Sequence, residues 1–456
     1  MLATSMLPAQ EAPQPPMPRG NPVAQDSHKT EKHLEQIETM GATSSSPQPS
    51  DNDLLTADQI RGTAVALSLD EAIAMAERDS PLLHATAAEN QRAVAAARTA
   101  RAYSNPSIEV YEGEQYSRPV ATPGPAGLLQ HYAAYQPVEV PAERKARQRI
   151  AQIAITGSRS AQQAALLSVN SQVKHAFYNA LRRREEISHA QENLKLVQDL
   201  YRRVQVEVNV GEKGRLELTR AETEVARAKF AVRSAQIEYA NSIALLRVAI
   251  AAQPDINLNP QGEFEPRISL PPLDQAREEV LRSHPILAET QASIQAAHAS
   301  LDREKALRIP QPTAFLEFEN QPDLRFWRAG VTVPIPLWDR RRGQIAGAKA
   351  AISQSVAVME QRRLELISSL ERAYEQYQLA DQQATSLEAG SLHAAESAVE
   401  AARAAYRFGE RGIVEVLDAQ RVLQSVRDDL LDAQAARQSA LIDLQELGAI
   451  TPGVKP

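Results

Sequence analysis

The pattern of apolar positions along the chain predicts two long helical hairpins. Along 218–249, apolar or small residues recur in alternating steps of three and four, and the same phase recurs along 416–447. This spacing places one stripe of side chains on one side of a helix and is typical of coiled-coil packing. A similar stripe precedes each glycine pair, along 194–208 before the first pair and along 392–406 before the second. We therefore expect each glycine pair to reverse the chain between two packed helices.

Four other stretches alternate with a period of two, as half-buried strands do. They are expected at about 106–118, 130–140, 311–320 and 326–336. In the third stretch Phe318 lies between Glu317 and Glu319, so one face of the expected sheet is apolar and the other polar. Each stretch has about the ~9–11 residues that a membrane-spanning strand needs. Trp327 begins the fourth stretch and would suit a membrane interface.

The chain is an internal duplication. LSLDEAIAMAERDSPLL at 67–83 resembles LPPLDQAREEVLRSHPIL at 270–287, and VGEKGRLEL at 210–218 resembles FGERGIVEV at 408–416. In each half we expect the same order of a short helix, a Ser-Pro or His-Pro break, a helix of about 22 residues, two strands, and a helical hairpin. The first helix of each hairpin runs nearly 70 residues, or roughly 100 Å at ~1.5 Å per residue.

Composition and the duplication together set the expected domains. Residues 1–62 contain eight prolines within the first fifty positions and no aromatic residue, so we expect a disordered tail. The repeats are expected at 63–252 and 270–450, with a linker at 253–269 and a tail at 451–456. The expected fold class is mainly α with a small β part.

Composition also argues against several functions. The net charge of −7 provides no basic footprint for nucleic acid, so we expect no nucleic-acid partner. The chain has no cysteine, its nine histidines show no ligand spacing, and it contains no phosphate loop or nucleophile motif. We therefore expect no enzymatic activity, no cofactor and no specific metal site.

The sequence contains no helical membrane span and no readable export signal. No run of ~18 apolar residues occurs, so no transmembrane helix is expected. The first residues lack a basic region and Pro8 interrupts their apolar run, so the pattern does not predict a secretory signal. This counts against export and conflicts with strands of membrane-spanning length.

Four strands are too few for a membrane barrel. The smallest membrane barrels use about eight strands, and an open strand edge is not tolerated in lipid. If the strands lie in a membrane, several copies of the chain must share one barrel. Their polar face would then line the lumen and their apolar face would meet lipid.

Three stretches resemble the TolC-type outer-membrane efflux family, most closely its CzcC-like heavy-metal branch. They are VPIPLWDRRRGQIAGAKA at 333–350, TRAETEVARA at 219–228 and LDAQRVLQSV at 417–426. The resemblance covers about 64–450 and implies a homotrimer with a twelve-stranded barrel in the outer membrane and an α-helical tube in the periplasm. It implies a passive duct for divalent cations such as cobalt, zinc, cadmium or nickel. The implied partners are outer-membrane lipid, a periplasmic membrane-fusion adaptor and an inner-membrane RND pump.

The resemblance also assigns roles to the glycine turns. It implies that the turns form the periplasmic tips that dock the adaptor, with residues Gly211, Glu212, Lys213, Gly214, Gly409, Glu410, Arg411 and Gly412. It implies a closed entrance held by Glu217, Tyr406 and Arg411. An acid–arginine pair suits a latch because its hydrogen bonds are charge-assisted and breakable. The alternatives are solvated tip charges and, for Tyr406, an ordinary seam residue.

Three carboxylates are expected on the polar face of the strands, namely Glu109, Glu317 and Glu319. In a lumen they would favour cations over anions, and the alternative is that they simply solvate the lumen. Two other functions stay open. A secretion duct for protein or drugs would use the same fold. A soluble coiled-coil scaffold would have no strands and no membrane fraction.

Overall fold

The computed structural model of the chain describes residues 65–115, 127–254 and 256–450. All the described residues belong to one compact unit. The tails expected at 1–62 and 451–456 lie outside the described residues.

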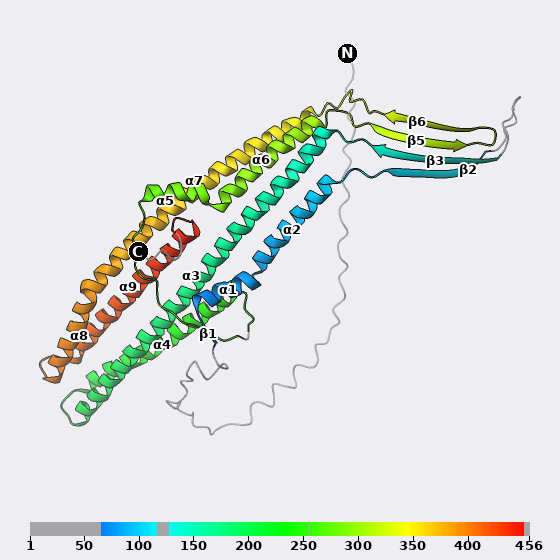
Figure 1. Ribbon diagram of the computed structural model, residues 1–456. Helices are drawn as coiled ribbons and strands as arrows, with labels where there is room; N and C mark the ends of the chain where they lie inside the picture. Colours follow the sequence, from blue (N-terminus) through cyan, green and yellow to red (C-terminus); the bar gives the residue numbers. More distant parts are fainter. Residues whose placement is uncertain (1–64, 116–126, 255, 451–456) are drawn as a thin grey trace, which may run out of the picture. The chain divides into compact units, whose positions relative to one another are not determined.

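The two halves of the described chain repeat one order of elements (Figure 1). The first half consists of α1 (Leu69–Asp79), α2 (Pro81–Arg101), β2 (Ser107–Gln115), β3 (Gly127–Pro137), α3 (Pro141–Asn209) and α4 (Arg215–Ala249). The second half consists of α5 (Leu273–Ser283), α6 (Pro285–Ala306), β5 (Thr313–Asn320), β6 (Arg325–Thr332), α7 (Arg342–Ser386), the π-helical turn η2 (Leu387–Ser391), α8 (Leu392–Arg407) and α9 (Ile413–Glu446). The expected mainly α architecture with a small β part is confirmed.

Helix boundaries follow the expected breaks. Proline occupies the first position of α2, α3 and α6, where the missing N–H costs no helical hydrogen bond. Ser68 and Glu71 form a capping box at the start of α1, so two otherwise free backbone donors are satisfied. Both short helices, at 69–79 and 273–283, end at the expected Ser-Pro and His-Pro breaks.

The second long helix differs from its expected form. A single helix was expected to lead to the second glycine turn, but η2 separates α7 from α8. Gly390 lies within this wider turn. Glycine has a low helix propensity and no side chain to pack, so a departure from regular α geometry is least costly there.

The four longer strands form one antiparallel sheet in the order β2-β3-β5-β6. Trp327 pairs with Phe318, and Ala329 pairs with Leu316, so the expected apolar side chains share one face. The strands lie side by side in Figure 1. Their presence makes the prediction of a strand-free scaffold wrong.

Prolines end two of the strands earlier than expected. β3 ends at Pro137 and β6 at Thr332, before the expected ends at 140 and 336. Proline has no N–H to donate to a ladder, so Pro334 stops the pairing of β6. The expected loop between the first two strands falls almost entirely on 116–126, outside the described residues.

A short parallel pair of strands was not predicted. β1 (Val65–Leu67) pairs with β4 (Leu258–Pro260), which lies inside the expected linker. Three residues are too few to show a period, so the sequence pattern carried no signal. The pair attaches the linker to the start of the first repeat.

Equivalent side chains build a buried core in each repeat. Ile243 and Leu246 pack in the first core, and Leu441 and Leu444 pack in the second, 198 positions later. All seam residues expected along 218–249 and 416–447 are buried or half-buried, so the heptad prediction is confirmed. Among the described residues, no helix is both long enough and apolar enough to cross a membrane.

Candidate functional site

The two glycine turns have the same local structure. Gly211 and Gly409 adopt left-handed backbone angles, with φ of 81° and 73°. Behind them the Glu212 amide donates to the Glu207 carbonyl and the Glu410 amide donates to the Ala405 carbonyl, each at 2.9 Å. These hydrogen bonds close a Schellman motif, which requires the left-handed angle that glycine adopts without strain. The sequence pattern GxxG therefore specifies two helix ends of one design.

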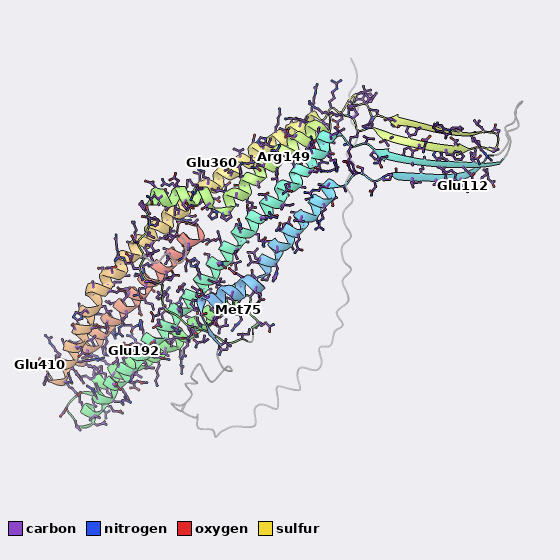
Figure 2. All side chains as sticks on the ribbon, viewed as in Figure 1. Met75, Glu112, Arg149, Glu192, Glu360 and Glu410 are labelled. Atoms are coloured by element: carbon purple, nitrogen blue, oxygen red, sulfur yellow. The ribbon has the colours of Figure 1, made fainter. Side chains whose placement is uncertain are left out.

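One apolar cluster joins both hairpins next to these turns. It contains Val204 from α3, Ala221 from α4, Tyr406 from α8, and Ile413 and Val416 from α9. The helical seams thus converge into one core shared by the two repeats. This core holds the two tips of one chain together. Figure 2 shows Glu410 at the free end of the α8–α9 hairpin.

Tyr406 links the tips through a partly buried hydrogen bond. Its hydroxyl donates to Glu207 Oε2 on α3 at 2.5 Å. Burial, this hydrogen bond and the nearby carboxylates of Glu207 and Glu217 raise the pKa of Tyr406 above its ordinary value. The Nζ atom of Lys213 lies 5.4 Å from the centroid of the tyrosine ring, within range of a cation–π contact.

The structure brings together only part of the expected gate. Glu217 lies close enough to Tyr406 to influence its hydroxyl, but its Oε2 atom is shielded from solvent and has no hydrogen-bond partner in the described part of the chain. Arg411 is exposed and forms no ion pair with any described residue. Within one chain the Glu217–Arg411 pair is therefore not formed.

Ion pairs connect the hairpins further from the tips. Arg421 of α9 lies 2.8 Å from Glu224 of α4. Arg427 of α9 lies 3.2 Å from Glu192 of α3 and 3.5 Å from Glu396 of α8. α9 thus carries two arginines that bind carboxylates of the other hairpin.

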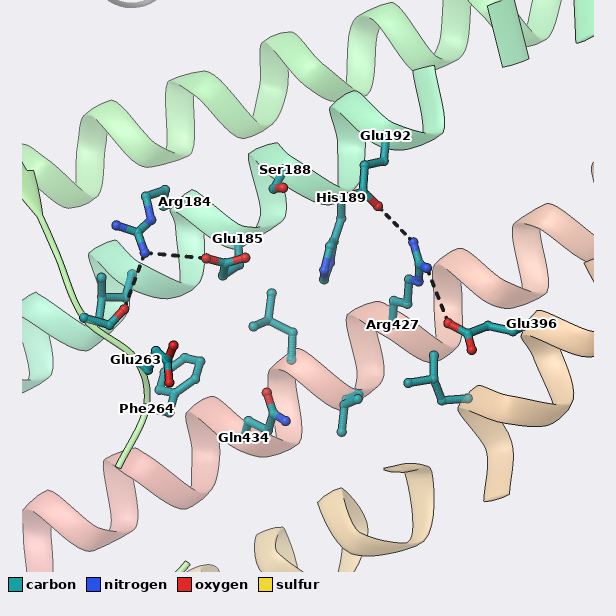
Figure 3. Close-up of a pocket in the computed structure, with 15 residues that line it drawn as sticks. Arg184, Glu185, Ser188, His189, Glu192, Glu263, Phe264, Glu396, Arg427 and Gln434 are labelled. Carbon is teal, nitrogen blue, oxygen red and sulfur yellow. Dashed lines mark hydrogen bonds and ion pairs between the residues drawn. The ribbon is translucent and has the colours of Figure 1, made fainter. Parts of the chain in front are cut away.

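Arg427 also borders a cavity of about 570 Å³ between α3, α8, α9 and the segment 262–264 (Figure 3). At the other end of the cavity Arg184 donates to the Pro260 carbonyl at 2.6 Å and lies 3.6 Å from Glu185. Figure 3 shows both arginines already paired with protein groups. The arrangement ties elements together and leaves no guanidinium on the cavity wall free for a ligand.

The polar face of the sheet carries all three expected carboxylates. Glu109, Ala133, Glu317 and Arg328 form one row across the four strands. Glu317 accepts hydrogen bonds from Tyr135, at 3.1 Å, and from Arg328.

Glu319 lies one row further along the same face. It accepts a hydrogen bond from Gln321 Nε2 at 2.8 Å. Among the described residues, no group of three or more His, Asp or Glu side chains is arranged to hold a metal ion.

Sequence reasoning missed Glu207 and the two arginines of α9. Glu207 lies one turn before the glycine of the first tip, beside the seam residue Val208, and a reading of seam-flanking charges on both hairpins would have marked it. Arg427 flanks its own seam in the same way, beside Val426. Arg421 lies two positions from both Ala419 and Leu423, so the seam pattern gave no signal for it. The sequence pattern does not show which of the helices α3, α4, α8 and α9 each charged side chain faces.

Comparison with known proteins places the chain among outer-membrane efflux components. A family model described as outer membrane efflux protein matches residues 72–252 and 276–448. The cobalt-zinc-cadmium resistance protein CzcC of Cupriavidus metallidurans is 24% identical over 80% of this chain and 86% of its own length. The probable outer membrane lipoprotein SilC of Salmonella typhimurium is 24% identical over 63% of this chain and 64% of its own length.

The fold is also shared with a solved structure. A crystal structure of CusC, described in connection with folding and transmembrane channel formation, superimposes with a TM-score of 0.72. It is 20% identical to this chain and covers 83% of this chain and 91% of CusC.

Proposed function

Because the chain belongs to the outer membrane efflux protein family, we propose that it is the outer-membrane channel of a tripartite efflux system. It conducts its cargo passively from the periplasm to the exterior and catalyses no reaction. In the complete system a periplasmic membrane-fusion adaptor and an inner-membrane RND pump work with it, and the pump supplies the energy.

The observation that carries this proposal is the incomplete four-stranded sheet. In the described part of the chain β2 and β6 each pair on one side only, which leaves two open edges. One face of the sheet is apolar and exposed, with Ile108, Leu316 and Trp327 among its side chains. Lipid covers such a face well, but it cannot satisfy open strand edges. Pairing β6 of one copy with β2 of the next removes both edges.

Three copies would close a barrel of twelve strands, within the range of known membrane barrels. α3, α4 and the α7–α9 hairpin then continue as an α-helical tube in the periplasm. The Ala-rich seams let helices approach closely along a tube wall. The tips at Gly211–Gly214 and Gly409–Gly412 face the adaptor.

Divalent heavy-metal cations are the proposed cargo. Support comes from CzcC, whose name describes cobalt, zinc and cadmium resistance. The carboxylates Glu109, Glu317 and Glu319 would lie in the lumen, where they favour cations. Selection among cations rests with the pump, because these carboxylates form no metal-ligand cluster among the described residues.

The tips form the proposed gate. Tyr406–Glu207 and Arg421–Glu224 hold the two hairpins of one chain together. Glu217 and Arg411 have no partners within the described chain. In a trimer these two side chains would complete the lock by meeting across neighbouring copies.

Membrane fractionation followed by mass determination in detergent tests the channel. A trimer recovered from the outer membrane supports the proposal, and a monomer or dimer in the soluble fraction contradicts it. Cargo is tested in cells that carry a matching adaptor and pump. Loss of the chain should sensitise these cells to zinc, cobalt or cadmium, and sensitivity unchanged by its loss would rule out metal cargo.

A further inference from the structure

The segment 333–342 runs from the end of β6 to the first residue of α7 and presents large apolar side chains to its surroundings. Ile335 is 73% exposed, Leu337 is 59% exposed and Trp338 is 92% exposed. Every residue from 331 to 340 is exposed. Apolar side chains so close together normally lie in a core or under a partner, because their contact with water is unfavourable.

The segment is held in place, so the exposure is a property of its fold. Pro334 and Pro336 restrict its backbone, and the Leu337 amide donates to the Ile335 carbonyl at 3.0 Å. The Arg341 amide donates to Asp339 Oδ1 at 2.8 Å. These bonds fold the segment back towards α7.

Arg341 then fixes the segment to α6. Its Nη2 and Nε atoms donate to Glu304 Oε2 at 2.6 and 3.0 Å. Its φ of 56° is unusual for a residue with a side chain, and the bonds to Glu304 compensate the strain. Trp338 therefore points outward from a braced turn.

The segment continues the apolar face of the sheet. Trp327, Ala329 and Val331 lie on that face within β6, and the stretch from Trp327 to Val331 spans roughly 13 Å at ~3.3 Å per residue. The apolar band of membrane barrels is about 25 Å tall. Extension of the chain to Ile335 brings this length to roughly 26 Å along the strand direction, which is roughly 20 Å of height at the ~40° tilt of barrel strands. The apolar side chains of the segment thus supply most of the part of the band that the strand lacks.

The backbone of the segment also suits a lipid boundary. Pro334 and Pro336 have no N–H, so this irregular stretch exposes fewer unpaired donors. The two tryptophans of the chain, Trp327 and Trp338, lie at opposite ends of the extended apolar surface. Indole rings prefer both interfaces of a membrane.

Two arginines next to Trp338 define the chemistry of the partner. Arg340 and Arg342 are exposed and form no ion pair with described residues, in contrast to Arg341. Guanidinium groups bind phosphate through paired hydrogen bonds. A surface with an apolar side, an indole and free arginines matches the headgroup boundary of a phospholipid leaflet.

The first repeat shows that this segment is not a by-product of duplication. Its junction places Pro141, the counterpart of Pro336, directly at the start of α3. The acid that follows, Glu143, is buried and pairs with Arg303 at 3.1 Å. The junction before α3 has no tryptophan and no cluster of unpaired arginines among its described residues. The residues between Pro336 and α7 are therefore specific to the second repeat.

We propose that residues 333–342 anchor the channel in the periplasmic leaflet of the membrane. Ile335, Leu337 and Trp338 occupy the boundary between headgroups and acyl chains, and Arg340 and Arg342 bind phospholipid phosphates. This anchor rests on the proposed outer-membrane location. It sets the depth at which the barrel meets the helical tube.

Fluorescence of single-tryptophan variants in phospholipid vesicles tests the anchor. Trp327→Phe leaves Trp338 as the reporter, and Trp338→Phe leaves Trp327 as the matched control. The vesicles contain phosphatidylethanolamine and phosphatidylglycerol. In one set the lipids carry bromine on the acyl chain near the headgroup, and in the other set near the methyl end of the acyl chain. Mass determination first establishes that both variants assemble as the unaltered chain does.

We expect Trp338 emission to shift to shorter wavelength and to be quenched more strongly by lipid brominated near the headgroup. We also expect brominated phosphatidylglycerol to quench Trp338 several-fold more than brominated phosphatidylcholine, and Arg340→Gln with Arg342→Gln to abolish this preference.

Three results overturn the anchor. Quenching of Trp338 by acrylamide but not by lipid places the segment in water. Protection from both quenchers, while Trp327 is quenched by lipid, shows that a neighbouring copy covers the segment and leaves the channel proposal intact. Absence of lipid quenching at both tryptophans contradicts the membrane location itself.

Discussion

The Tyr406 hydroxyl of α8 donates a hydrogen bond of 2.5 Å to Glu207 Oε2 of α3, and this bond joins the two hairpin tips of one chain. Tyr406→Phe keeps the ring in its core and removes the donor, which leaves a shielded carboxylate. A hydrogen bond to a charged group contributes about 1.5–3 kcal/mol. We expect hydrogen exchange at the tip amides to accelerate by about tenfold or more and single-channel conductance to rise.

Tyr201→Phe is the matched control, because Tyr201 packs against the same cluster and its hydroxyl has no partner among described residues.

The hydrogen bond of Tyr406 also makes stability depend on pH. Folding raises the pKa of Tyr406 by burial and by the bond to Glu207, so its contribution is complete below the ordinary value of ~10 and is lost as pH rises through the raised value. Ultraviolet titration of Tyr406→Phe should lack one late-ionising phenol, and an unchanged curve would contradict this assignment.

Glu217→Ala combined with Arg411→Ser tests the lock between copies. Neither side chain has a partner within the described chain, so a structural role in the monomer predicts little effect. If they pair across copies, the double variant raises single-channel conductance in planar bilayers. Glu410→Ala removes another exposed charge of the second tip and should leave conductance unchanged. If the channel of the double variant stays tightly closed, neither residue belongs to the gate.

Gly211→Ala and Gly214→Ala separate backbone strain from the loss of glycine itself. A Cβ meets no atom within 4 Å at either position, but only Gly211 has a left-handed φ, of 81°. The left-handed angle costs a residue with a side chain about 1–2 kcal/mol. Gly211→Ala should therefore open the first tip more often, seen as about fivefold or faster local hydrogen exchange. Gly214 is the N-cap of α4, where alanine is less favourable than glycine, so Gly214→Ala should accelerate exchange less than Gly211→Ala does. Equal acceleration in both variants would show that left-handed strain is not the cause.

Glu317 and Arg328 provide opposite charges on one row of the sheet, so their variants should move ion selectivity in opposite directions. Glu317→Gln leaves Arg328 uncompensated, and we expect a lower preference for cations over anions in reversal-potential measurements. Arg328→Gln should raise that preference. Glu319→Gln should act as Glu317→Gln does. If none of the three variants changes the preference for cations over anions, this face of the sheet does not line the conducting path.

His284 makes the start of α6 sensitive to acid. Its Nδ1 atom accepts a hydrogen bond from the Ile286 amide at 3.2 Å, and burial lowers the pKa of His284 below its ordinary value of 6.5. The capping contribution, about 1 kcal/mol, is therefore complete above the ordinary pKa and lost as pH falls through the lowered value.

His284→Asn keeps a side-chain acceptor that does not titrate, so thermal melts between pH 7 and pH 5 should lose part of their acid destabilisation. His84→Asn alters an exposed histidine in α2 and should retain the full pH dependence. Equal pH dependence in both variants would assign the acid effect to other groups.

Local rules and periodicity determined most of the element plan. Spacing of three and four residues predicted the seams from Leu218 and Val416, and proline predicted the helix starts at Pro81 and Pro285. Period-two alternation predicted that Phe318 and Trp327 would share a face, and their pairing confirms it. These features depend on side chains close in sequence, so they can be predicted from the amino-acid sequence alone.

Tertiary structure decided how charges far apart in sequence meet. The family resemblance implied a gate of Glu217, Tyr406 and Arg411, whereas the folded chain pairs Tyr406 with Glu207, 199 positions away. It likewise pairs Arg421 with Glu224 and places β4 beside β1. A helical period specifies which side of a helix a residue occupies but not which neighbour that side faces. That choice follows from the packing of four helices around one tip core, where the burial of many seam residues fixes the partner of each polar side chain.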